Sequence, residues 1–193
     1  MAALRDLIQQ STGGTVYDMY SSEVMALCGA APHAWLRAAL HRHDVRVLLL
    51  QSPALAALHA DQLCDADAGL RLREPLLGRR CVYRAPHFGD QLLQMALRHI
   101  AETPALHHDY NKLYLATYQG LETDIVPQVV SYRRYELPGA APALAAHLAA
   151  APLSAQVPPA LQPALAQYSR AAHALLVHVK HNPDYLLDEI FIN

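Results

Sequence analysis

Charged residues are scarce in this sequence of 193 residues, and their pattern argues against a nucleic-acid-binding protein. They make up 17% of the chain, and the formal net charge is −2. No run of lysine and arginine exceeds two residues, so the basic surface that holds a phosphate backbone is missing. Lysine occurs only twice, against thirteen arginines, a bias that we attribute to GC-rich bacterial coding.

Cysteine is also scarce, with three residues and no CxxC pair. This pattern excludes a disulfide framework and a four-cysteine zinc site. It fits a reducing compartment, and we therefore expect a cytoplasmic protein.

Membrane-spanning and secretory segments are not expected either. Arg5 and Asp6 interrupt the apolar N-terminus, which is unlike a secretory signal. The longest uncharged run, 137–169, contains six prolines and is rich in alanine, so it is a poor candidate for a transmembrane helix.

The common enzyme signatures GxxxxGK[ST], GxGxxG, GxSxG and HExxH are absent. Apolar residues, by contrast, reach 53% of the chain. So apolar a composition predicts either a large core or a surface partly covered by a partner.

Apolar residues recur mainly with the helical period, which predicts a mainly α protein. The expected helices are 2–10, 16–28, 32–43, 53–64, 88–102, 106–121, 142–151 and 163–181. The helix over 88–102 is the clearest, and 138–163 is expected to contain a proline- and alanine-rich connector.

Three segments have β character. The bounded apolar run 45–50 favours a strand over a continuation of the preceding helix, and 70–77 with 80–84 predicts a short hairpin. The segment 128–137 is compatible with either state. We therefore expect one domain, 1–193, an irregular helical bundle with at most a small antiparallel β element. No β–α–β alternation is regular enough to predict a parallel sheet.

Histidine is abundant, with twelve residues. His41 and His43 are candidate metal ligands, because a His-x-His pair on an extended segment places both rings on one face. On a helix the two rings would point apart, and both would then be capping or solvated side chains at a helix C-terminus.

His87, His99 and Glu102 are the candidate catalytic residues. His87 precedes a helix N-terminus, where a loop side chain is free to do chemistry and an anion is stabilised. His99 and Glu102 are three residues apart on one helix, a spacing that orients an imidazole for proton transfer. Capping and surface pairing are the alternatives.

Arg133 and Arg134, flanked by two tyrosines, are candidates for holding a phosphate or carboxylate cofactor or ligand. A solvated strand face is the alternative. The sequence identifies no particular cofactor and leaves the oligomeric state open.

Two functions follow as expectations. The first is a non-catalytic accessory or adaptor subunit that binds a partner protein or peptide, expected because catalytic motifs are missing and charge is low. The second is a metal- or cofactor-dependent enzyme that uses histidine and carboxylate residues.

Overall fold

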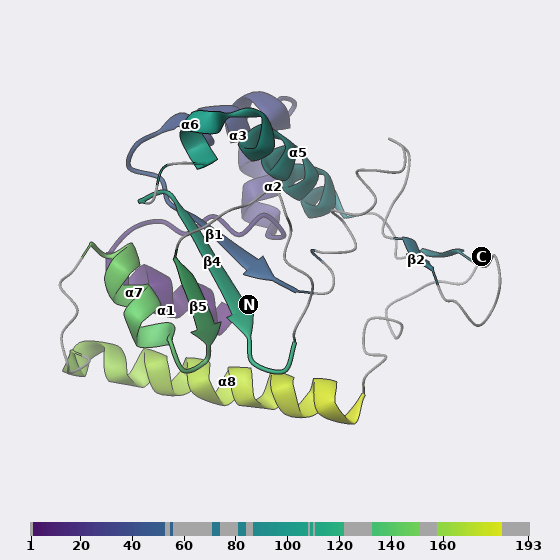
Figure 1. The fold of residues 1–193 in the computed structure, drawn as a ribbon. Helices are drawn as coiled ribbons and strands as arrows, with labels where there is room; N and C mark the ends of the chain where they lie inside the picture. Colours follow the sequence, from purple (N-terminus) through teal and green to yellow (C-terminus); the bar gives the residue numbers. More distant parts are fainter. Residues whose placement is uncertain are drawn as a thin grey trace.

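A three-stranded parallel sheet lies at the centre of the protein in the computed structural model (Figure 1). The structure describes residues 2–52, 55, 71–73, 81–83, 87–107, 109, 111–121, 133–150 and 158–182. Strands β1 (Val47–Gln51), β4 (Leu113–Tyr118) and β5 (Arg134–Leu137) stand in the order β1-β4-β5. Helices dominate the described residues, but the prediction of a helical bundle with only a small antiparallel β element is wrong.

The central strand β4 explains the error. The sequence analysis assigned 106–121 to one helix, whereas the structure has the short helix α6 (Pro104–His107) followed by β4. Leu113 and Leu115 face one side of the sheet, while Tyr114 and Ala116 face the other. A strand buried on both faces shows no polar alternation, so its apolar residues also satisfied the helical period.

Helices α3 (Pro32–His41) and α5 (Phe88–Glu102) cover one face of the sheet. α5 has the bounds expected from its apolar stripe. Both helices bury leucines against β1 and β4, and α2 (Ser22–Cys28) packs beside α3. The buried residues of this layer are Leu36, Leu40, Leu49, Leu55, Ala96, Leu97, Ile100, Leu106, Leu113 and Leu115.

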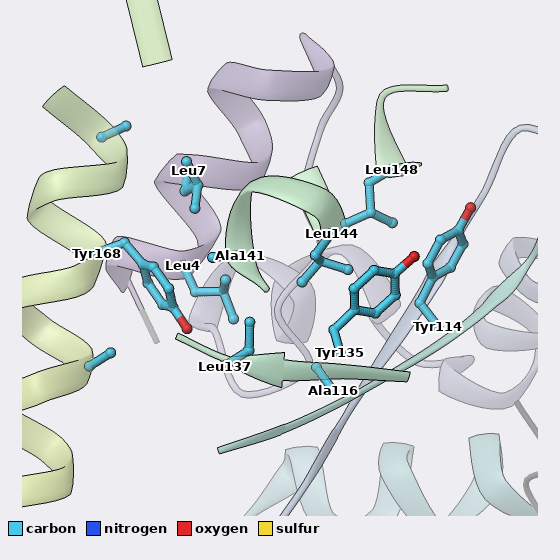
Figure 2. Close-up of a cluster of buried hydrophobic side chains, with 12 residues drawn as sticks. Leu4, Leu7, Tyr114, Ala116, Tyr135, Leu137, Ala141, Leu144, Leu148 and Tyr168 are labelled. Carbon is cyan, nitrogen blue, oxygen red and sulfur yellow. The ribbon is translucent and has the colours of Figure 1, made fainter. Parts of the chain in front are cut away.

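Helices α1 (Ala2–Thr12), α7 (Ala141–Leu148) and α8 (Gln162–His181) cover the other face. Figure 2 shows this cluster, in which Tyr168 of α8 and the leucines of α1 converge on β5. A single-turn 3₁₀ helix, Pro159–Leu161, leads into α8. The result is a helix–sheet–helix sandwich that buries both faces of a parallel sheet.

The N-terminus of α2 lies six residues later than the sequence predicted. Ser21 is its N-cap, with extended backbone dihedrals, and its Oγ accepts a hydrogen bond from the backbone N–H of Val24 at 3.2 Å. Gly29 closes the helix with a positive φ of 51°, as expected of a C-terminal glycine. The Ser21 hydroxyl therefore caps the helix and fixes its start at Ser22.

The expected hairpin is present as a short antiparallel ladder of three residue pairs. β2 (Arg71–Arg73) and β3 (Cys81–Tyr83) run antiparallel, apart from the central sheet. The expected helix 53–64 lies outside the described residues except for Leu55, whose N–H is accepted by the Ser52 hydroxyl at 3.2 Å. In the described part of the chain, no helix is long and apolar enough to cross a bilayer.

The second half of α8 departs from the expected core. Leu175 and Leu176 lie on the apolar stripe of the helix expected over 163–181, but Leu175 is 38% exposed and Leu176 is only partly buried. The last buried residue of α8 is Ala172. In Figure 1 the yellow end of α8 continues past the strands that its first half covers.

Candidate functional site

The N-terminal ends of the three strands bring most of the candidate residues to one edge of the sheet. Helices α3, α5 and α7 all end there, which the contacts of their last residues show. The Lys112 ammonium, just before β4, donates to the Arg42 carbonyl at 2.5 Å. Arg46, just before β1, donates to the Leu148 carbonyl at the end of α7. These bonds satisfy carbonyls that helix C-termini leave without intrahelical partners.

His41 and His99 meet at this edge. Their Nε2 atoms lie 3.1 Å apart, and their ring centroids 5.1 Å apart at an interplanar angle of 71°. His41 is the last residue of α3 and His99 lies in the last turn of α5, so two packed helices fix the pair. The sequence analysis had assigned these two histidines to separate candidate sites.

Several charged groups surround the pair. The pKa of His99 is lowered, first by partial burial and then by the neighbouring His41, Arg37 and His33, while Glu102 acts in the opposite direction. His33, Arg37 and His41 are four residues apart on α3 and so share one face of that helix. A lowered pKa keeps the imidazole of His99 neutral, with a lone pair on one nitrogen, at neutral pH.

His43 lies in the turn after α3 and is exposed. Next to it, Asp44 accepts two hydrogen bonds from the Arg42 guanidinium, at 3.0 Å and 2.5 Å. These bonds hold the pKa of the Asp44 carboxyl at about 2. Both carboxylate oxygens of Asp44, the acidic residue next to His43, are therefore hydrogen-bonded to Arg42.

His87 is the N-cap of α5. Its Nδ1 accepts the backbone N–H of Gly89 at 3.0 Å, and Asp90 Oδ2 accepts the backbone N–H of His87 at 2.9 Å. Tyr20 stacks on the imidazole, with ring centroids 5.3 Å apart, and donates its hydroxyl to Asp90 at 2.9 Å. The Nδ1 of His87 therefore serves as a structural acceptor in this conformation.

Arg133 and Arg134 differ in their surroundings. The Arg133 guanidinium lies 5.6 Å from the ring centroid of Tyr114 and donates to its hydroxyl at 3.3 Å, whereas Arg134 is exposed on β5. Figure 2 shows the rings of Tyr114 and Tyr135 side by side. The Tyr135 hydroxyl lies 2.5 Å from Nδ1 of His147, which ties β5 to α7.

The opposite edge of the sheet, where open α/β sheets usually bind ligands, holds residues that the sequence analysis missed. Tyr168 of α8 donates its hydroxyl to Tyr118 at the end of β4, at 3.4 Å, and burial raises the pKa of both phenols. An open hollow at this end of the sheet is lined by Gln119, Glu136, Gly139 and Ala140. The two tyrosines are fifty residues apart, and no local pattern links them.

Within the described ranges, no three histidine, cysteine, aspartate or glutamate side chains are arranged to hold a metal ion together. No model of a known protein family matches the chain, and no curated protein matches it by sequence.

Proposed function

We propose that the protein is a non-catalytic subunit that binds a partner protein, and that the second half of α8 is its docking segment. The observation that carries this proposal is the exposure of apolar side chains there. Leu175 is 38% exposed, and Leu176 and Val179 on the same face of the helix are only partly buried. Water-exposed apolar side chains on one face of a helix favour association, because their burial releases ordered water.

Three residues of this segment continue the stripe that holds α8 on the core. Ala172 is buried, and Leu175, Leu176 and Val179 follow it at spacings of three, four and seven. This is the spacing by which an amphipathic helix lies in a groove of another protein. The first half of the stripe packs on α1, and the second half supports the same kind of contact with a partner.

The charge of α8 specifies the partner further. The helix contains no acidic residue, and its polar positions include Arg170, Lys180 and three histidines. The partner that fits is a protein with an apolar groove and acidic residues along its rim. Opposite charges at the rim add specificity and raise the association rate.

We place this interaction in the bacterial cytoplasm. Cys28 is a free, buried thiol, and burial raises its pKa, so the unreactive thiol form is favoured. A structural cysteine of this kind supports a reducing compartment.

Site-specific photocrosslinking tests the docking surface. A photoreactive residue replaces Leu175 in one variant and Ala174, which is exposed on the other side of the helix, in the matched control. We expect position 175 to yield one discrete adduct, whose crosslinked peptide lies in an apolar groove rimmed by Asp and Glu, and position 174 to yield little. Equal labelling at both positions, or a crosslink to a second copy of this chain, would contradict the proposal.

The alternative, a metal- or cofactor-dependent enzyme, predicts a different result for the histidines. In a binding subunit, His87→Ala and His99→Ala leave complex formation and any linked activity within about threefold. Loss of a general acid or base costs on the order of 10²–10⁴ in rate. A collapse of that size in a folded variant would support the enzyme.

A further inference from the structure

We propose that His41 and His99 form a two-histidine binding site for a divalent transition-metal ion such as Zn²⁺ or Cu²⁺, with water in the remaining coordination positions. The site goes beyond the proposed docking function, because it lies on α3 and α5 and does not involve α8.

The spacing of the two nitrogens carries the inference. Zinc–nitrogen bonds are roughly 2.0–2.1 Å long, so two imidazole nitrogens on one ion lie roughly 2.8–3.4 Å apart at octahedral or tetrahedral angles. The Nε2 atoms of His41 and His99 are 3.1 Å apart, within that range. To chelate an ion, each ring must turn so that its Nε2 lone pair points at a shared ion instead of at the other ring.

The rigidity of the supporting elements favours binding. Leu36 and Leu40 of α3 and Leu97 and Ile100 of α5 are buried in one cluster, so the backbones beneath the histidines are fixed by packing. A pair held in this way loses little conformational entropy when it binds an ion, because its geometry is organised beforehand.

The surrounding charges modulate the affinity of the site for a cation. An imidazole ligand must be neutral, so metal binding weakens as the pH falls. Arg37 opposes a cation, Glu102 attracts one, and His33 opposes one when it is protonated. Imidazole ligands suit Zn²⁺, Cu²⁺ and Ni²⁺, and Cu²⁺ should bind most tightly of the three.

Zn²⁺ titration by calorimetry tests the site, with His41→Ala, His99→Ala and His43→Ala as the variants. All three positions are exposed or partly exposed, so the variants should fold, and circular dichroism checks this. We expect the tightest Zn²⁺ equivalent to weaken about tenfold or more when His41 or His99 is replaced. His43 lies two residues after His41 in the turn that follows α3, and His43→Ala should leave the Zn²⁺ affinity within about threefold of wild type.

Electron paramagnetic resonance of one Cu²⁺ equivalent gives an independent readout. We expect hyperfine coupling to two imidazole nitrogens in the wild type and to one in His99→Ala. The inference is overturned if the wild type binds no tighter than the His41→Ala, His99→Ala double variant, if only one of the two histidines matters, or if His43→Ala weakens binding equally. None of these outcomes depends on α8, so the docking proposal stands or falls separately.

Discussion

The hydroxyl of Tyr135 lies 2.5 Å from Nδ1 of His147, and this contact joins the start of β5 to the last turn of α7. Burial raises the pKa of Tyr135, so the phenol keeps its proton. The hydroxyl donates to Nδ1 in the imidazole tautomer that carries its proton on Nε2.

Tyr135→Phe removes the hydroxyl and leaves Nδ1 of His147, which is partly buried, without this hydrogen-bond partner. We expect a loss of about 1–2 kcal/mol in the free energy of unfolding, measured by urea titration. Tyr17→Phe, at a side chain that is 46% exposed, is the control and should change stability by less than about 0.5 kcal/mol. Equal stability of the two variants would show that the contact contributes nothing.

Gly89→Ala should destabilise the start of α5. A Cβ atom at this position would lie 2.7 Å from Cδ1 of Tyr20 and 2.8 Å from the Met19 carbonyl oxygen. Because one of these atoms belongs to the backbone, a side-chain rotation does not relieve the clash. We expect a cost of about 1–3 kcal/mol in thermal unfolding.

Gly14→Ala is the matched control for this substitution. Its nearest neighbour, Oγ1 of Thr12, would be 3.5 Å from the new Cβ, an ordinary contact. It should change stability by no more than about 1 kcal/mol. A Gly89→Ala protein as stable as the control would contradict the close packing of Tyr20 on α5.

Leu97→Ala and Leu175→Ala separate the core from the exposed half of α8. Leu97 is 1% exposed, and its truncation should cost about 2–5 kcal/mol in denaturant titration. Leu175 is 38% exposed, so its truncation should cost less than about 1 kcal/mol. A loss at position 175 as large as that at position 97 would mean that Leu175 belongs to the core.

The elements predicted correctly from sequence include α5 and β1, each of which has a clear local pattern. α5 has a single buried stripe, and β1 is a short apolar run bounded by polar residues, so both were expected. β4 was missed because layers on both sides bury it and remove its alternation. His41 and His99 are 58 residues apart in the sequence and meet because their two helices pack together. No local spacing in the sequence predicts this contact.

The position of His99 makes its titration informative. Because burial, His41, Arg37 and His33 lower its pKa, we expect its NMR titration midpoint to lie below the ordinary 6.5. The folded state then binds this proton less readily than the unfolded state, so the stability that His99 contributes is lost as the pH falls through the folded pKa. Arg37→Gln should raise the midpoint, and Glu102→Gln should lower it further. Shifts in the opposite directions would contradict the arrangement of these side chains.

The most direct test of the docking account compares Leu175→Glu with Ala174→Glu for assembly with the partner. Both variants place the same charge at exposed positions of one helix, but only position 175 lies on the apolar stripe. The measurement is the fraction of the protein that elutes as a complex with the crosslinked partner in size-exclusion chromatography, with circular dichroism as the check on folding. The account predicts that Leu175→Glu loses the complex, while Ala174→Glu stays within about threefold of wild type. Retention of the complex by a folded Leu175→Glu protein would contradict it.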